Sequence, residues 1–523
     1  MGHTAENTFH RVLICIVLLS IAIFLQADDG GVLSRKIQLP KSKDSVYKLL
    51  RQVSDKSGYL FIYDSQIIDN DKEVKIAKGE YTLREAIYAI TGNRNLQISV
   101  VGNHILLQLP EERKERTLQV VKEVEPEKEK YITLSGTIYD QIADEPLPYS
   151  AIGVNNTTIG TISNQDGEFK LILPDSLRHL SIKLTHVGYQ SQEVEISLLD
   201  GHHVRFSLEP QIIPLQEIVV RAIDPLQEIK LMLDKRKLNY PQSSTYLTTF
   251  YREGVDHKRK NVDITEAVLK VYKTGYHVNA NFDQVKLVKM RRIKSMLEKD
   301  TIFTKMKSGI HSALLLDVMK NLPDFLNPEE FDKFDYTHTD ISVVDGRRIN
   351  VISFEQKEYI TEPLYTGQLF IDSENQALVE ARFEVNPKYV EHATNMYIEK
   401  KNRGINLTLQ KVHYTISYKS SSDSIYYINH IRGDLDFKVR RKRRLFSSPL
   451  HLWFEMVNCK VDTSEVNGFS RKERISTQNI FSDTKYKYDK DFWGHFNVIL
   501  PEEKLKELII NNLSEVRNSL DEE

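Results

Sequence analysis

The densest group of chemically distinctive side chains is a basic run near the end of the chain. Six of the seven residues from 438 to 444 are basic, namely Lys438, Arg440, Arg441, Lys442, Arg443 and Arg444. Guanidinium groups bind phosphates through paired hydrogen bonds, so this run is a candidate surface for lipid phosphates or an anionic glycolipid. The alternative reading is a solvated hairpin tip.

No residue pattern in the sequence indicates catalysis. His451 and Glu455 lack the spacing of a helical zinc site, and Gly468-Phe469-Ser470 lacks the second glycine of a nucleophile elbow. No phosphate loop or dinucleotide fingerprint occurs. We therefore expect no catalytic residue, no metal, no cofactor and no enzyme activity. A hydrolase whose site follows no familiar motif is kept as an alternative.

Cys459 and the pair Arg252 and Glu253 could take part in chemistry, but the sequence favours a structural role for each. Cys459 has no base beside it in the sequence, so we expect a buried, small side chain in a strand rather than a nucleophile. The adjacent Arg252 and Glu253 are a candidate polar site inside a sheet. Charged neighbours of this kind are more often a structural ion pair or simply exposed, and that is the reading we take.

Bulk properties narrow the class of protein. A chain of 523 residues is too long for a single core. Its 71 basic and 73 acidic residues give a net charge of −2, so no global field for nucleic acid or an acidic substrate is implied. Arg11 precedes an apolar run, Val12 to Leu25, that is shorter than the ~20 residues of a membrane span and fits a secretory signal. We expect residues 1–27 to be that signal, which excludes a nuclear role for the basic run.

Residues 33–110 alternate strand and helix patterns. Ser45 and Thr82 are predicted helix caps, Thr82 through a capping box with Glu85, and Gly58 and Gly92 are predicted helix ends. The run from Tyr81 to Ile87, followed by a hairpin around Gly102-Asn103, resembles the secretin and TonB short N-terminal (STN) domain. That resemblance implies a small α/β docking module in the periplasm. Residues 111–130 carry many charges and almost no apolar side chains, so we expect a solvated linker.

Residues 131–222 contain short strand patterns separated by Asp, Gly, Pro and Asn at intervals of about ten residues, the rhythm of a small antiparallel sandwich. Five pieces carry a family resemblance in order: 134–140, 145–154, 158–161, 164–171 and 184–189. They resemble the carboxypeptidase regulatory-like domain at the front of many outer-membrane proteins of Bacteroidota. The resemblance implies a seven-stranded, transthyretin-like β-sandwich and an envelope location, but no reaction.

The end of this segment has two readings. Glu217, Ile218, Val219 and Val220 are similar to a segment that precedes the plug and barrel of transporters carrying this sandwich, which implies a strand that contacts TonB. The other reading, which we favour, is the last strand and exit of the sandwich. The roughly 300 residues that follow do not show the many amphipathic strands that a transporter barrel requires.

Residues 223–523 read mainly as strands with a few helices. The expected strands include 425–428 and 435–439, and the expected helices include 225–238 and one near Asp317. This succession predicts one large, curved antiparallel sheet. Gly367 to Asp372 followed by Ala377 to Val379 is similar to a strand pair in LolA-like lipoprotein carriers. A carrier would need an apolar cavity lined by inward positions such as Leu369, Ile371 and Val379.

The sequence therefore predicts a multidomain, mainly β, exported protein of the periplasm that is associated with the outer membrane. Our first hypothesis is a non-enzymatic binding or scaffold role with an outer-membrane or periplasmic partner in TonB-linked uptake or signalling. The alternative is a LolA-like carrier of a lipid or lipoprotein acyl chain. A scaffold requires a filled core and an exposed patch, whereas a carrier requires a cavity.

Overall fold

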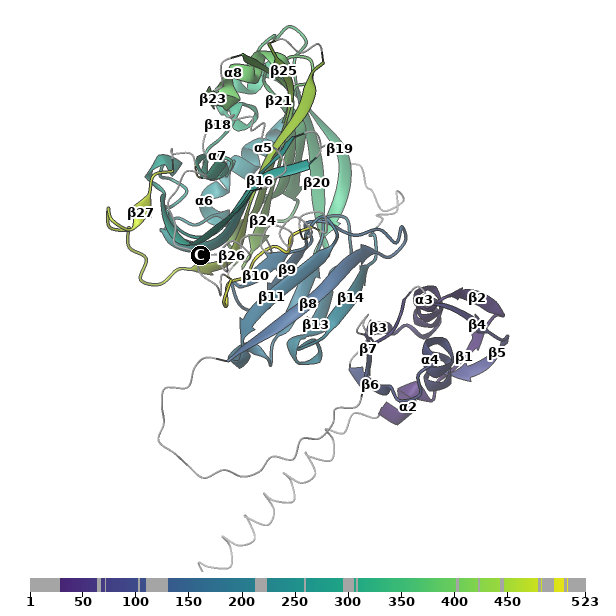
Figure 1. Cartoon of the computed structure of the whole chain (residues 1–523). Helices are drawn as coiled ribbons and strands as arrows, with labels where there is room; N and C mark the ends of the chain where they lie inside the picture. The colour runs from purple at the N-terminus through teal and green to yellow at the C-terminus, as the bar shows by residue number, and fades with distance from the viewer. Residues whose placement is uncertain are drawn as a thin grey trace, which may run out of the picture. The chain divides into compact units, whose positions relative to one another are not determined.

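The computed structural model describes residues 29–63, 67–70, 72–101, 104–109, 130–211, 223–257, 260–294, 305–306, 309–400, 404–421, 424–442, 446–477, 481, 493–502 and 506. Five predicted features lie wholly or almost wholly outside these residues: the export signal, the linker, Glu217 to Val220, Arg443 with Arg444, and the closing helix 502–520. No helix in the described part of the chain is long and apolar enough to cross a membrane. The chain divides into two compact units, the first mainly residues up to 128 and the second mainly those that follow (Figure 1).

The first unit is a small α/β fold with a core of its own. Its elements are α2 (Asp29–Leu33), β1 (Lys36–Leu39), β2 (Ser42–Ser45), α3 (Val46–Ser57), β3 (Leu60–Tyr63), β4 (Glu73–Ile76), β5 (Gly79–Thr82), α4 (Leu83–Thr91), β6 (Gln97–Val101) and β7 (His104–Gln108). β3 pairs in parallel with β7, which pairs antiparallel with β6. Antiparallel pairs β1–β5 and β2–β4 complete the strands.

Local signals set the helix ends of this unit. The Ser45 hydroxyl accepts from the backbone N–H of Lys48, and Thr82 and Glu85 form the predicted capping box. Gly58 and Gly92 end the helices with φ of 77° and 68°, a left-handed conformation that glycine adopts without steric cost. The apolar faces of α3 and α4 are buried in one cluster with side chains of β1, β6 and β7.

The second unit begins with a seven-stranded sandwich. Its strands are β8 (Tyr131–Asp140), β9 (Ala151–Val154), β10 (Gly160–Ile162), β11 (Glu168–Pro174), β12 (Ser181–Thr185), β13 (Gln192–Glu195) and β14 (His203–Leu208). One sheet has the order β10-β9-β12-β13 and the other β11-β8-β14. Alternate residues of β8 and β14 are buried, as expected for sheets with one face on a core.

A large antiparallel sheet makes up most of the remaining chain. In the described residues it has 11 strands in the order β19-β20-β21-β22-β24-β25-β26-β15-β16-β17-β27. Their bounds are β15 (Thr245–His257), β16 (Lys260–Lys273), β17 (Gln284–Lys294), β19 (Phe334–Val344), β20 (Arg347–Gln356), β21 (Tyr365–Asp372), β22 (Leu378–Val385), β24 (Ile405–Ser420), β25 (Tyr426–Arg441), β26 (Ser448–Asp462) and β27 (Arg474–Ile475). The multidomain, mainly β prediction is confirmed.

The sheet curves around a few short helices, which lie on its inner side in Figure 1. They are α5 (Pro225–Asp234), α6 (Arg236–Asn239), α7 (Gly309–Leu315) and α8 (Thr394–Tyr397), and β18 (Lys305–Met306) pairs with β23 (Ile398–Lys400). Ile229 and Met232 of α5 and Ile310 of α7 are buried in one apolar cluster with side chains from most strands. Leu369 and Ile371 are fully buried in that cluster, and Val379 is nearly so.

Two element predictions are wrong in detail. The helix expected over 225–238 ends at Asp234, and a separate turn of helix, α6, follows Lys235. The two strands expected around 425–428 and 435–439 are one strand, β25. The polar residues between them lie within the strand, where Arg432, for example, donates two hydrogen bonds to Asp434.

The other face of the sheet carries a buried group of charges. Arg252 of β15 is 1% exposed, and its guanidinium binds the carboxylate of Glu455 on β26, with Nε 2.8 Å from Oε1. Glu266 of β16 lies 3.6 Å from the same guanidinium and accepts from Arg291 Nε at 2.5 Å. The predicted pairing of Arg252 with Glu253 is wrong, because successive strand residues point to opposite faces. Glu253 instead accepts from the Tyr251 hydroxyl.

Candidate functional site

The sandwich is fixed to the sheet by both apolar and polar contacts. Ile162 of β10 is buried with Phe250, Val457 and Cys459 of the sheet. The Thr158 hydroxyl donates to the carbonyl of Val461 at 2.6 Å, and the backbone N–H of Gly188 donates to the carbonyl of Val343 at 2.9 Å. These contacts hold two edges of a cleft at fixed positions.

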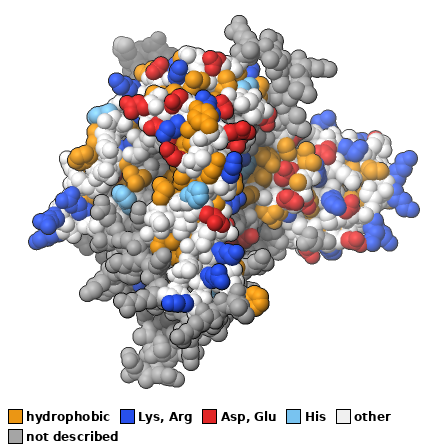
Figure 2. Space-filling view, turned by 90° about the horizontal axis from the view of Figure 1, so that it is seen from above, with side chains coloured by type: hydrophobic (Ala, Val, Ile, Leu, Met, Phe, Trp, Pro, Cys, Tyr) orange, Lys and Arg blue, Asp and Glu red, His pale blue; other side chains and the backbone are white. Residues whose placement is uncertain are grey.

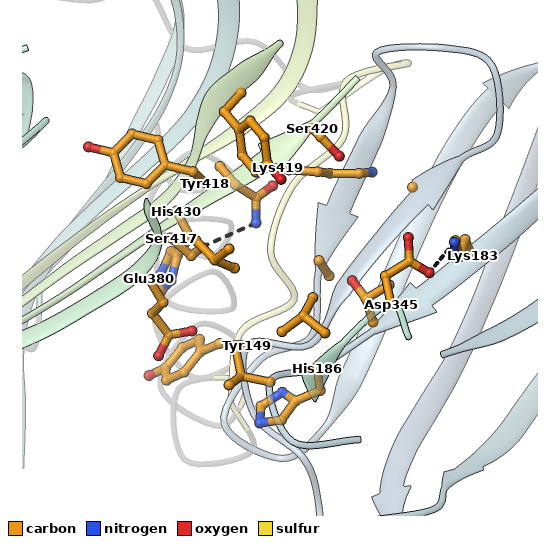
Figure 3. Close-up of a pocket in the computed structure, with 18 of the residues that line it drawn as sticks. Tyr149, Lys183, His186, Asp345, Glu380, Ser417, Tyr418, Lys419, Ser420 and His430 are labelled. Atoms are coloured by element: carbon orange, nitrogen blue, oxygen red, sulfur yellow. Dashed lines mark hydrogen bonds and ion pairs between the residues drawn. The ribbon is translucent and has the colours of Figure 1, made fainter. Parts of the chain in front are cut away.

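The cleft lies between the sandwich and the sheet and has a volume of about 620 Å³ (Figure 3). Strands β9 and β12 and the loop after β9 form one wall, and β22, β24 and β25 form the other. A bulge in β25 contributes to the second wall, since Ser417 pairs with His430 but the next residue, Tyr418, pairs with Ile428. Consecutive residues Asn429 and His430 therefore both line the cleft.

Three of the four Lys and Arg side chains in the cleft have carboxylate partners. Lys183 is paired with Asp345, and Arg382 with Glu380. Arg347 lies 2.6 Å from Asp372 and also donates to the hydroxyl of Tyr426 at 2.9 Å. These pairs hold three of the charged side chains of the lining in place.

Lys419, at the end of β24, is the fourth basic residue. Figure 3 shows its side chain extending from the sheet toward the sandwich. Its amine has no hydrogen-bond or ion-pair partner among the described residues. Burial, and to a smaller extent the positive charge of Lys183, lower the pKa of Lys419 to about 8.

A serine and a histidine also meet beside the cleft. The Ser150 Oγ lies 3.1 Å from His186 Nδ1 and within hydrogen-bond distance of the carbonyl of Leu147. The Leu147 carbonyl also accepts from the Ser163 hydroxyl at 2.7 Å, and which atom donates between Ser150 and His186 depends on the tautomer of the imidazole. Ser150 is 1% exposed, so its hydroxyl is buried away from any ligand in the cleft. This pair orients the imidazole, and burial lowers its pKa.

The predicted basic patch lies at the far end of β25. Lys438, Arg440 and Lys442 are exposed, and Arg441 is half-buried. Phe446, where the described chain resumes before β26, is 88% exposed. Figure 2 shows basic and acidic side chains interspersed over the middle of the face that it presents. The hairpin tip therefore carries exposed cations and an exposed aromatic ring close together in the sequence.

Cys459 lies in β26 and is buried, as predicted. Its thiol contacts the carbonyls of Val457 and Asn497 at 3.7 and 3.4 Å. Burial raises the pKa of this thiol to about 12, so the thiolate that a nucleophile needs is disfavoured. No group of three or more His, Cys, Asp and Glu side chains in the described residues is arranged to hold a metal ion.

Sequence reasoning did not identify the cleft residues. Lys183, Arg347, Arg382 and Lys419 come from separate strands of two domains, and no local motif joins them. One usable signal was present: Gly153 and Gly160 interrupt strand patterns, and a glycine inside a strand often marks a close approach by another group.

Comparisons with known proteins identify the sandwich. Residues 134–220 match the family model of the CarboxypepD_reg-like domain, which confirms that part of the sequence interpretation. No curated protein matches the chain. The family model defines a module within the chain and no reaction.

Two solved structures overlap about half of the chain. One is a domain from Vibrio parahaemolyticus that is named for outer membrane lipoprotein sorting, with 8% identity, a TM-score of 0.21, and coverage of 48% of this chain and 96% of that one. The other is a DUF1329 family protein from Desulfovibrio piger, with 12% identity, a TM-score of 0.19, and coverage of 47% and 96%. TM-scores this low carry no argument about fold or function.

Proposed function

We propose that this chain is a non-enzymatic binding or scaffold protein of the periplasm, associated with the outer membrane and with TonB-linked uptake or signalling. In this proposal residues 33–110 are an STN domain, residues 1–27 are an export signal, and the source is a member of the Bacteroidota. The CarboxypepD_reg-like sandwich and the small α/β unit with its capping box support the module assignments.

The observation that carries the proposal is the β25–β26 hairpin tip. Exposed Lys438, Arg440 and Lys442 beside exposed Phe446 combine cations for lipid phosphates with a ring suited to the interface of a membrane. The sheet behind the tip has a filled core, as a scaffold requires. The partner of this tip is an anionic lipid surface.

Vesicle co-sedimentation tests this docking with protein purified from envelope fractions. We expect binding to vesicles that contain phosphatidylglycerol, little binding to phosphatidylcholine vesicles, and weaker binding at high salt. Each basic residue near an anionic surface contributes about 1 kcal/mol, so the double variant Arg440→Gln, Lys442→Gln is expected to bind about 30-fold more weakly. Phe446→Ser is expected to weaken binding at all salt concentrations.

The matched control removes two positive charges from another exposed turn, with Arg471→Gln and Lys472→Gln. It should bind almost as the unaltered protein does. Equal losses in both double variants would show a nonspecific charge effect, and the docking proposal would then be wrong.

The carrier alternative makes a different demand on the sheet. Leu369 and Ile371 are fully buried in a core that α5 and α7 share, so a carrier must open these helices to admit an acyl chain. Native mass spectrometry distinguishes the two functions. A copurifying lipid mass that disappears in Leu369→Asp, while the fold is retained, would favour the carrier over the scaffold.

A further inference from the structure

The cleft between sandwich and sheet contains a basic side chain whose amine has no counter-ion among the described residues. Lys183, Arg347 and Arg382 are each paired with a carboxylate, whereas the Lys419 amine has no partner among the described residues. Placing a charged group in a half-buried site without a partner costs free energy, so such groups are usually paired. An unpaired ammonium in a cleft therefore calls for an explanation.

The sandwich provides a matching feature on the opposite wall. Gly153 of β9 and Gly160 of β10 are directly paired across the two strands. A Cβ atom at position 153 would lie 1.6 Å from Lys419 Nζ, and one at position 160 would lie 2.7 Å from the Ile152 carbonyl. The paired glycines leave bare backbone on which the amine rests, and any other residue at 153 would displace it.

The remaining lining defines the chemistry that a ligand would meet. Hydroxyl and amide groups of Asn155, Ser417, Ser420 and Asn429 line the cleft beside Lys419. Such groups donate to and accept from the hydroxyls of a polar ligand. A volume of about 620 Å³ falls within the range of small-molecule sites.

We infer that this cleft binds a small, hydroxyl-rich anion, a sugar bearing a carboxylate or a phosphate, with Lys419 as the counter-ion of the anionic group. Lys183 and Arg347 also line the cleft, but Asp345 and Asp372 already neutralise their charges. The inference does not rest on membrane docking, because the hairpin tip lies at the other end of β25 from Asn429 and His430.

Isothermal titration calorimetry at pH 7, where Lys419 is mostly protonated, tests the inference with three probes: D-glucuronate, inorganic phosphate and neutral D-glucose. We expect one or both anions to bind and glucose not to bind. Binding of glucuronate alone indicates a carboxylate ligand, and binding of phosphate alone indicates a phosphorylated one. Lys419→Met keeps an unbranched side chain of similar length and should weaken anion binding at least about 10-fold, the effect of losing one charge-assisted hydrogen bond.

Two variants serve as controls. Lys411→Met removes a positive charge from the same strand outside this cleft and should leave binding within about twofold. The hairpin variant Arg440→Gln, Lys442→Gln should bind the same anions unchanged, which separates this inference from the docking proposal. Thermal unfolding of each variant verifies that the fold is retained.

Three results would overturn the inference: no binding of either anion at millimolar concentration, anion binding that is unchanged in Lys419→Met, or glucose binding as tight as glucuronate binding. Gly153→Ala provides an independent check, because its new methyl group must move the amine. It should weaken anion binding in a folded protein.

Discussion

Replacing Arg252 by Met is expected to destabilise the large sheet strongly. Arg252 and Glu455 are each 1% exposed, and the guanidinium makes two hydrogen bonds to the carboxylate. In the absence of the Arg252 guanidinium, the nearest cation to Glu455 is Arg432, whose guanidinium lies 3.7 Å from the carboxylate, beyond a direct hydrogen bond. A buried carboxylate left without its partner costs about 3–5 kcal/mol.

Urea unfolding followed by tryptophan fluorescence measures this loss. The chain has two tryptophans, and both report on this region: the ring of Trp453 lies 5.5 Å from the Arg252 guanidinium, and Trp493 lies 5.5 Å from Phe250. The double variant Arg252→Met, Glu455→Leu removes both charges and should recover most of the lost stability. The cycle of single and double variants gives the coupling energy directly.

The pair of exposed Lys460 and half-buried Asp462 on β26 provides the control. Lys460→Met should change the free energy of unfolding by no more than about 0.5 kcal/mol. A loss below about 1 kcal/mol in Arg252→Met, or a double variant as unstable as the sum of the single ones, would refute the reasoning.

Three further predictions concern the same sheet. Burial alone would raise the pKa of Glu455, but Arg252, with His430 and Arg432, lowers this pKa to about 2. The stability that Glu455 contributes is therefore present above its ordinary pKa of about 4.5 and is lost as the pH falls toward 2. Urea unfolding across this pH range should show a smaller decline in the free energy of unfolding for Glu455→Gln than for the unaltered protein. Gly433→Ala places a methyl group 2.6 Å from the Phe454 ring and should lower stability by about 1–3 kcal/mol in the same assay. Cys459 should react with iodoacetamide only on unfolding, and fast labelling of the folded chain would contradict its buried position.

Local signals allowed the small α/β unit to be predicted closely. The Thr82 capping box and the left-handed Gly58 and Gly92 depend on residues within one turn of each helix. β25 shows the opposite case, because its buried polar residues look like a turn until their partners are known. Arg432, for example, donates two hydrogen bonds to Asp434 on the same strand. The site around Lys419 depends on two domains meeting, which no window of sequence contains.

The pairing of β15 with β26 has a consequence for how the chain folds. Arg252 and Glu455 are 203 positions apart, yet they lie on neighbouring strands in the middle of the sheet. A ribosome must therefore release nearly the whole chain before β15, which already pairs with β16, can pair with β26. Closing so long a loop is slow. A slowly folding chain stays extended long enough to be threaded through a translocation channel, which suits the export that we propose. Truncation after β25 would remove β26, which lies between β25 and β15. The strands β19 to β25 and the strands β15 to β17 would then have no strand to join them.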